Sequence, residues 1–185
     1  KIFLFSSSSD NETKKNSLFV ETINKRTLLS NNDIEKISEI DFSGNKRRNS
    51  GDFNYEISRD SSKILIYSVL PYEKNESAKF KLLVLDNNLE KIWANNITLP
   101  YNDNLFKLED YKISNKGNVY LVGKIYDGKK IEKKKRSKTD LEPKPNYKYK
   151  VLSYNKKESR NKEYLVEVED YFISQMKIAI DENEN

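Results

Sequence analysis

KILIYS, at Lys63–Ser68, has two close counterparts in this chain: KIFLFS at Lys1–Ser6 and NVYLVG at Asn118–Gly123. All three stretches carry apolar residues at consecutive positions. This pattern is typical of a short β-strand that is buried on both faces. Self-similarity at a regular period indicates a repeat architecture, and such a repeat determines the whole fold.

A second, more polar strand follows each of these stretches and runs on into a turn at Asn24, Asp86 or Asn155. The second strands are SLFV at Ser17–Val20, KFKL at Lys79–Leu82 and KYKV at Lys148–Val151. Both kinds of strand recur after 62 positions between the first and second copies, and the third copy carries an insertion at residues 127–146. We therefore expect repeat units at about 1–62, 63–117 and 118–185, all within one all-β region.

Two further strands complete each expected unit. One precedes the KILIYS-type strand, at Tyr55–Ser58, at Tyr111–Ser114 and more weakly at Met176–Ala179. The other follows the polar strand, at Ile37–Ile40, Glu90–Ala94 and Tyr164–Val168. Asn31–Ile37 has a cap-like start and apolar spacing that also fits one or two helical turns. Elsewhere, short β-branched and aromatic runs between Asn, Asp, Gly and Ser clusters indicate an all-β protein.

Composition limits the chemistry that the 185 residues can perform. Lys and Arg number 34 against 29 Asp and Glu, a net charge of +5 in a mostly mixed pattern, so we do not expect nucleic acid as a partner. The 12 Tyr and 8 Phe argue for an ordered chain. There is no Cys and no His, which removes disulfides, thiolate sites and the commonest general base and metal ligand. We expect no catalytic residues, cofactor or metal.

The apolar runs are about one strand long, far below the roughly 18 residues that a membrane-spanning helix needs. We therefore expect no transmembrane segment. The chain begins on a strand without an initiating Met, and we therefore expect a mature or truncated piece.

The phrases ISRDSSKIL, at Ile57–Leu65, and LVLDNNLE, at Leu83–Glu90, resemble the hairpins of β-propeller blades of the Kelch, NHL and TolB-like type. The Gly-His and Trp-Asp pairs of WD repeats and the Gly-Gly pair of Kelch repeats are missing. Lys- and Asn-rich propellers of this style resemble uncharacterised envelope proteins of Bacteroidetes-type bacteria. The resemblance implies about three consecutive four-stranded antiparallel blades, in the periplasm or at the cell surface of a Gram-negative bacterium.

Physical reasoning agrees with this resemblance. A single sheet cannot bury a strand on both faces, whereas stacked blades can. Propellers close with about 4–8 blades, so three units imply a partial propeller, and the chain is expected to be part of a larger one. A β-sandwich of two antiparallel sheets remains the alternative, although it gives no reason for the 62-residue period.

The insertion carries the most conspicuous local feature, a run of cations that could bind an anionic glycan or lipid headgroup. The residues of this candidate patch are Lys129, Lys130, Lys133, Lys134, Lys135, Arg136 and Lys138. The alternative is a solvated hairpin loop, which charge runs usually form. Trp93, the single tryptophan, is expected to pack between blades rather than to anchor a partner.

Three functions follow from these features. The first is a non-catalytic binding or scaffold module that contacts another protein in a larger assembly of the cell envelope, because loops on a rigid β framework commonly carry recognition. The second is a glycan-active propeller enzyme whose site lies in blades outside this chain. The third is a polyanion or membrane-surface binder that acts through the basic insertion.

Overall fold

The computed structural model describes residues 2–43, 51–71, 76–128, 146–156, 162–168 and 173–181, with Asn31 and Asn32 described by their backbone alone. Within these ranges the chain forms eleven β-strands and no helix. The all-β prediction is therefore confirmed. The stretch that also fitted a helix, Asn31–Ile37, lies inside β3 (Ser30–Asp41), where Ile34, Glu35 and Lys36 pair with residues of a neighbouring strand.

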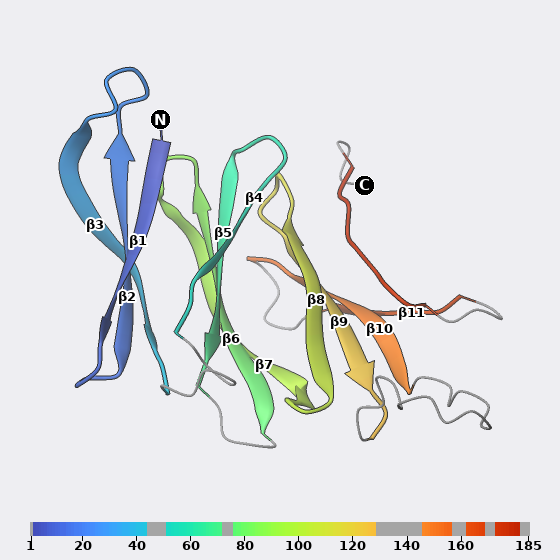
Figure 1. Ribbon diagram of the computed structural model, residues 1–185. Coiled ribbons are helices and arrows are strands. Elements are labelled where there is room, and N and C mark those ends of the chain that lie inside the picture. Colours follow the sequence, from blue (N-terminus) through green and yellow to red (C-terminus); the bar gives the residue numbers. More distant parts are fainter. Residues whose placement is uncertain are drawn as a thin grey trace, which may run out of the picture.

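The strands form three antiparallel sheets, and neighbours in the sequence are neighbours in each sheet (Figure 1). The first sheet contains β1 (Ile2–Asp10), β2 (Lys15–Ile23) and β3 (Ser30–Asp41). The middle sheet contains β4 (Asn54–Ile57), β5 (Lys63–Leu70), β6 (Ser77–Asp86) and β7 (Lys91–Asn102). The third sheet contains β8 (Phe106–Ile113), β9 (Val119–Tyr126), β10 (Tyr147–Tyr154) and β11 (Lys162–Val166).

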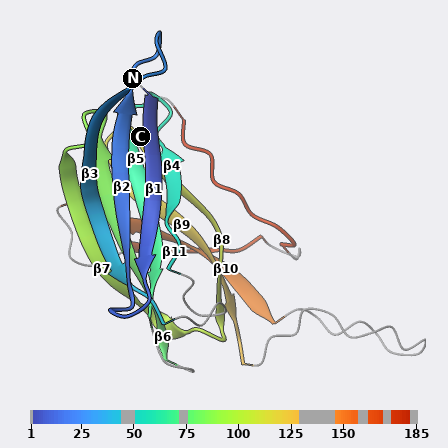
Figure 2. The same cartoon turned by 60° about the vertical axis from the view of Figure 1, so that its left-hand side comes forward.

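The middle sheet lies between the other two and is buried on both faces. On β5, Ile64 and Ile66 pack with Leu18 of β2 in one apolar cluster. Leu65 and Tyr67 belong to a second, larger cluster with residues of the third sheet. Figure 2 shows the first sheet lying across one face of the middle sheet. The prediction of a strand buried on both faces is therefore confirmed for β5.

β1 departs from this expectation although its sequence is similar. Phe3 and Phe5 pack toward the middle sheet, but Ile2 and Leu4 point the other way and are 38% and 49% exposed. β1 has a sheet on one side only, so one of its two apolar faces stays in solvent. The same pattern of residues therefore leads to different burial in β1 and β5.

The turns between corresponding strands share their hydrogen bonds. Asn24 Oδ1 accepts from Arg26 and Thr27 after β2, and Asp86 Oδ1 accepts from Asn88 and Glu90 after β6. Side-chain oxygens of Asn and Asp favour such turns because they mimic a backbone acceptor. The turn residues Leu28 and Leu89 both have positive φ, 57° and 72°.

The turns that lead into β5 and β9 are also alike. Ser58 N–H donates to the carbonyl oxygen of Lys63, and Lys63 N–H donates back to Ser58 Oγ. Ser114 makes the same two hydrogen bonds with Asn118. Gly117, with φ of 81°, supplies the left-handed residue of the second turn.

Residues 173–181 form no strand, so the weak strand prediction at Met176–Ala179 is wrong. The segment is extended, but a β-strand also needs a partner for its backbone groups. Three stacked antiparallel sheets are compatible with propeller blades and with sandwich-type packing, the two architectures that the sequence allows.

Gly123 of β9 tests how closely its neighbouring strand β8 packs against it within the third sheet. A Cβ at this position would lie 2.3 Å from Cε2 of Phe106, whose ring is buried. We expect Gly123→Ala to lower the free energy of unfolding by about 1–3 kcal/mol through overpacking. Urea unfolding measures this change.

The control is the double variant Gly123→Ala with Phe106→Leu, in which the smaller side chain makes room for the new methyl group. The destabilisation by Gly123→Ala should be smaller in the Phe106→Leu background than in the wild type. Equal stability of Gly123→Ala and the wild type would contradict the close contact.

Candidate binding surface

The seven cations of the predicted anionic-partner patch lie outside the described residues. The structure does describe the two ends of the insertion, which connects β9 to β10. Asp127 N–H donates to the carbonyl oxygen of Asn146 at 2.8 Å, and Asn146 Nδ2 donates to the carbonyl oxygen of Asp127 at 2.6 Å. The ends of the insertion are therefore held together on adjacent strands of the third sheet.

A lysine surrounded by tyrosines lies at this base. Lys124 Nζ is 3.6 Å from the ring centroid of Tyr147 and 5.8 Å from those of Tyr126 and Tyr149. The rings of Tyr147 and Tyr149 meet edge to face, with centroids 5.7 Å apart. Contacts between an ammonium group and aromatic faces are favourable. The cluster therefore anchors the strand residues from which the insertion leaves and to which it returns.

Tyr149 also connects this base to the C-terminal segment. Its hydroxyl donates to the carbonyl oxygen of Ser174 at 3.1 Å. Burial, with Glu109 and Tyr147 as lesser causes, raises the pKa of Tyr149 to about 12. The hydroxyl stays protonated at neutral pH and acts as a donor. The register that sets Lys124 opposite Tyr149 brings the cluster together.

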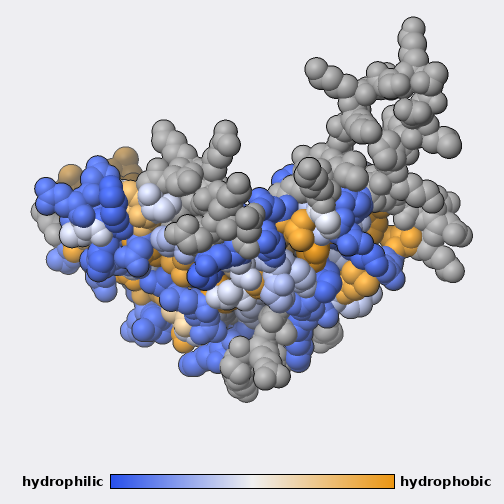
Figure 3. Space-filling view, turned by 90° about the horizontal axis from the view of Figure 1, so that it is seen from below, coloured by the Kyte–Doolittle hydropathy of each residue, from blue (hydrophilic) through white to orange (hydrophobic). Residues whose placement is uncertain are grey.

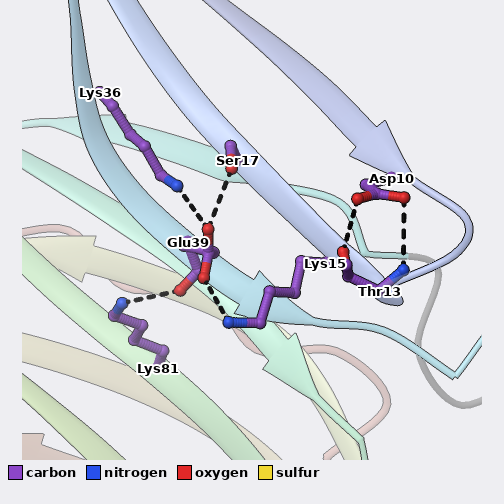
Figure 4. Close-up of polar contacts among 7 residues, drawn as sticks. All are labelled: Asp10, Thr13, Lys15, Ser17, Lys36, Glu39 and Lys81. Carbon is purple, nitrogen blue, oxygen red and sulfur yellow. Dashed lines mark hydrogen bonds and ion pairs between the residues drawn. The ribbon is translucent and has the colours of Figure 1, made fainter.

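A second charged cluster joins the first and middle sheets (Figure 4). Glu39 of β3 pairs with Lys36 and, at 2.9 Å, with Lys15, and accepts from Ser17 Oγ at 3.3 Å. Lys81 of β6 donates to the backbone oxygen of Glu39 at 3.1 Å. Burial lowers the pKa of Lys81, against the opposing effect of Glu39. The position of Lys81 at the contact between two sheets indicates a structural link.

A third cluster joins the middle and third sheets. Tyr101 of β7 donates to Glu163 of β11 at 2.5 Å, and Lys150 of β10 lies 2.8 Å from Tyr101 Oη and 2.9 Å from Glu163. Burial raises the pKa of Tyr101, and the hydrogen bond to Glu163 acts in the same direction. The Tyr101 hydroxyl is therefore a hydrogen-bond donor that lies between the Lys150 ammonium and the Glu163 carboxylate, whose charges compensate each other. This geometry fixes one sheet on the other.

Trp93 has the role expected from the sequence. It lies on β7, is 7% exposed, and belongs to the apolar cluster between the middle and third sheets. Its indole N–H donates to the carbonyl oxygen of Gly117 at 3.0 Å. The partner stands in the turn that leads into β9, so Trp93 also connects the two sheets.

The surface formed by the described residues has an open, mostly polar hollow. It has a volume of about 410 Å³ and lies between the first sheet and the β6–β7 turn. Its lining includes the carboxylates Asp33 and Glu35 and the amide Asn88. In Figure 3 the visible described surface is largely hydrophilic, with hydrophobic residues in separate small areas.

Among the described residues, no group of three or more His, Cys, Asp or Glu is arranged to hold a metal ion. The same part of the chain contains no helix with the length and apolarity to cross a membrane. Comparison with known proteins gives no match, whether to a family model, a curated protein or a solved structure.

Glu39 supports a prediction about pH. Its hydrogen-bonded ion pairs, Lys36 first and then Lys15, lower its pKa from 4.5 to about 2. A lowered folded-state pKa contributes stability that is present above the unfolded pKa and is lost as the pH falls through the folded one. Glu39→Gln should therefore be less stable than the wild type at pH 6, and this difference should vanish as the pH approaches 2.

Urea midpoints measured between pH 2 and 6 check this dependence on the pKa of Glu39. The control is Glu12→Gln, the same chemical change in the exposed β1–β2 turn. A stability difference between Glu39→Gln and the wild type that is independent of pH would contradict the ion-pair assignment.

Proposed function

We propose that this chain is a non-catalytic binding and scaffold module whose three sheets are blades of a β-propeller and whose partner is another protein in a larger assembly. The insertion held at its base by Asp127 and Asn146 carries the proposal. It leaves a rigid sheet between paired strands, the position from which surface loops usually recognise partners. The absence of His and Cys from the sequence supports a non-catalytic role.

The blade interpretation is supported by the shared strand order of the middle and third sheets and by the matching turns. It is also supported by the inner contact between β4 and β8, where Lys112 pairs with Glu56. In a propeller, the first strands of successive blades approach one another around a central axis. A sandwich of two sheets gives no reason for the same turn chemistry to recur at Ser58 and Ser114.

A second candidate function is the binding of anionic lipid surfaces through the insertion. Seven Lys and Arg between positions 129 and 138 favour it. Clustered cations near an anionic membrane contribute about 1 kcal/mol each, and this attraction weakens as salt is added. The two candidates use the same loop, so a single set of variants separates them.

The test compares two variants with the wild type. The first has all seven cations replaced by Ser. The second lacks residues 129–145, which joins Gly128 directly to Asn146 and leaves Asp127-Gly128-Asn146 as a tight hairpin loop. Circular dichroism and urea unfolding establish that both variants fold.

If the chain is a protein scaffold, a partner protein that is captured from the source organism and purified should bind the wild-type chain. Its affinity should fall at least tenfold when residues 129–145 are removed. Vesicles of phosphatidylserine and phosphatidylcholine should not bind. Partner binding that survives the deletion would overturn the role of the insertion. Salt-sensitive binding to phosphatidylserine vesicles that the seven Ser replacements abolish would favour the second function.

A further inference from the structure

The longest stretch of the sequence without a charged residue lies in β7. It runs from Ile92 to Asn102, in a chain in which 34% of the residues are charged. Since β7 spans Lys91–Asn102, the lysine at its first position is its single charged residue. The strand is therefore neutral along almost its whole length of 12 residues.

β7 is the outer strand of the middle sheet (Figure 2). It pairs with β6 on one side, and no strand in the described part of the chain pairs with it on the other. Described strands precede and follow β7 in the sequence, so its edge belongs to neither end of the chain. An open edge presents a row of N–H and C=O groups that can pair with a further strand.

Hydrogen bonds at the two ends of the β6–β7 pair show which backbone groups of β6 face β7. At one end, Asp86 N–H donates to the carbonyl oxygen of Glu90 at 2.9 Å. At the other end, Asp103 N–H donates to the carbonyl oxygen of Glu76 at 2.9 Å. Backbone groups alternate in direction along a strand. The even-numbered residues of β6 therefore direct their backbone groups toward β7.

The pairing register then identifies the free groups of β7. Leu82 lies opposite Asn95, and Phe80 lies opposite Ile97. In an antiparallel pair, two opposite residues of this kind exchange both hydrogen bonds. The residues between and beside them direct their backbone groups away from β6, and these are Ala94, Asn96 and Thr98.

Pro100 confirms this alternation and limits the free edge. It has the same outward direction, so its missing N–H removes no bond to β6, which is the position that a sheet tolerates for proline. The edge that can pair thus ends before Pro100. Over the rest of it, the side chains of Ala94, Asn95, Asn96 and Thr98 are exposed, small and uncharged.

The outer strands of the other two sheets differ from β7. Native proteins protect open edges with charged side chains or by making the edge strand short. β11 has 5 residues and includes Lys162 and Glu163. β3 has 12 residues, as β7 does, but is rich in charged residues, namely Asp33, Glu35, Lys36, Glu39 and Asp41. Between Ala94 and Thr98, β7 has neither protection.

We propose that β7 accepts an extended, uncharged segment of a partner protein, which adds an antiparallel fifth strand to the middle sheet. The backbone groups of Ala94, Asn96 and Thr98 supply the hydrogen bonds, which are the main source of affinity when a strand is added to a sheet. This surface is separate from the insertion of the third sheet. The proposal depends only on the middle sheet, so it holds for blades and for a sandwich alike.

The side chains along the edge determine the chemistry of the added segment. Residues of an added strand lie directly opposite those of β7 and interact with them. Between Ala94 and Thr98 no charged residue is available, so a charged residue of the segment loses water without gaining a counterion. Thr, Ser and β-branched residues fit, because they form favourable cross-strand pairs with residues such as Thr98. A second copy of this chain is disfavoured, because each copy has a net charge of +5.

Nuclear magnetic resonance of the ¹⁵N-labelled whole chain measures the pairing, with a blocked peptide of alternating Thr and Val as the probe. We expect saturable shifts of the amide signals of Ala94, Asn96 and Thr98 and slower hydrogen exchange at all three. The amides of Asn95 and Ile97, which already pair with β6, should change less. The same peptide with Glu or Lys in place of Thr should bind at least tenfold more weakly.

Two variants at one position test the edge itself. Asn96→Pro removes an outward N–H and leaves the bonds to β6 in place, and Asn96→Lys places on β7 the kind of charge that protects β3. Each should weaken peptide binding at least tenfold. The matched control is Asn87→Lys, the same change at an exposed residue of the β6–β7 turn, and it should bind the peptide as the wild type does. Circular dichroism and urea unfolding establish that all three variants fold.

The absence of any change at Ala94, Asn96 and Thr98 on addition of the peptide would overturn the proposal, as would equal binding by the wild type and Asn96→Lys. Concentration-dependent changes at the same three amides without peptide would identify a second copy as the occupant instead. Equal affinity for the charged peptides would contradict the assigned chemistry. None of these results affects the test of the proposed function, because that test uses the insertion.

Discussion

Burial of the middle sheet on both faces is the constraint on which the rest of the structure depends. Apolar side chains leave β5 in both directions, and neither face can be covered from within its own sheet. Layered packing is the general solution for apolar sheet faces. The first and third sheets supply the two covers, and the one-sided burial of β1 follows from its place at one end of this stack.

Polar contacts fix the angle at which the sheets meet. Lys81 reaches the backbone of Glu39 across one contact, and Tyr101 and Lys150 meet Glu163 across the other. Exposed ion pairs contribute little stability on average. In this protein the polar contacts orient the sheets relative to one another, because the hydrophobic effect is not directional and does not by itself select one orientation.

Much of this architecture could be predicted from the sequence, because β5 and its turns carry strong local signals. Consecutive apolar residues at Ile64–Ile66 predicted burial on two faces, and Asp86 predicted its turn. The exposure of Ile2 and Leu4 could not be predicted, since β1 has the same local pattern and differs in what lies beside it. Met176–Ala179 has the pattern of a strand, but no strand in the described part of the chain pairs with it. Of the candidate site, the sequence predicted only the run of cations. The clusters around Lys124 and Glu39 could not be predicted, because they depend on strand register and on contacts between residues that are distant in the sequence.

Truncation of two adjacent residues of β5 tests the central claim most directly. Leu65 is fully buried and Ile66 is 2% exposed, and their side chains point to opposite faces of the sheet. Urea unfolding should show that Leu65→Ala and Ile66→Ala each lower the free energy of unfolding by about 2–5 kcal/mol. If one of the two substitutions costs less than about 0.5 kcal/mol, as at a surface site, the middle sheet would have a solvent-exposed face and the stack of three sheets would be wrong.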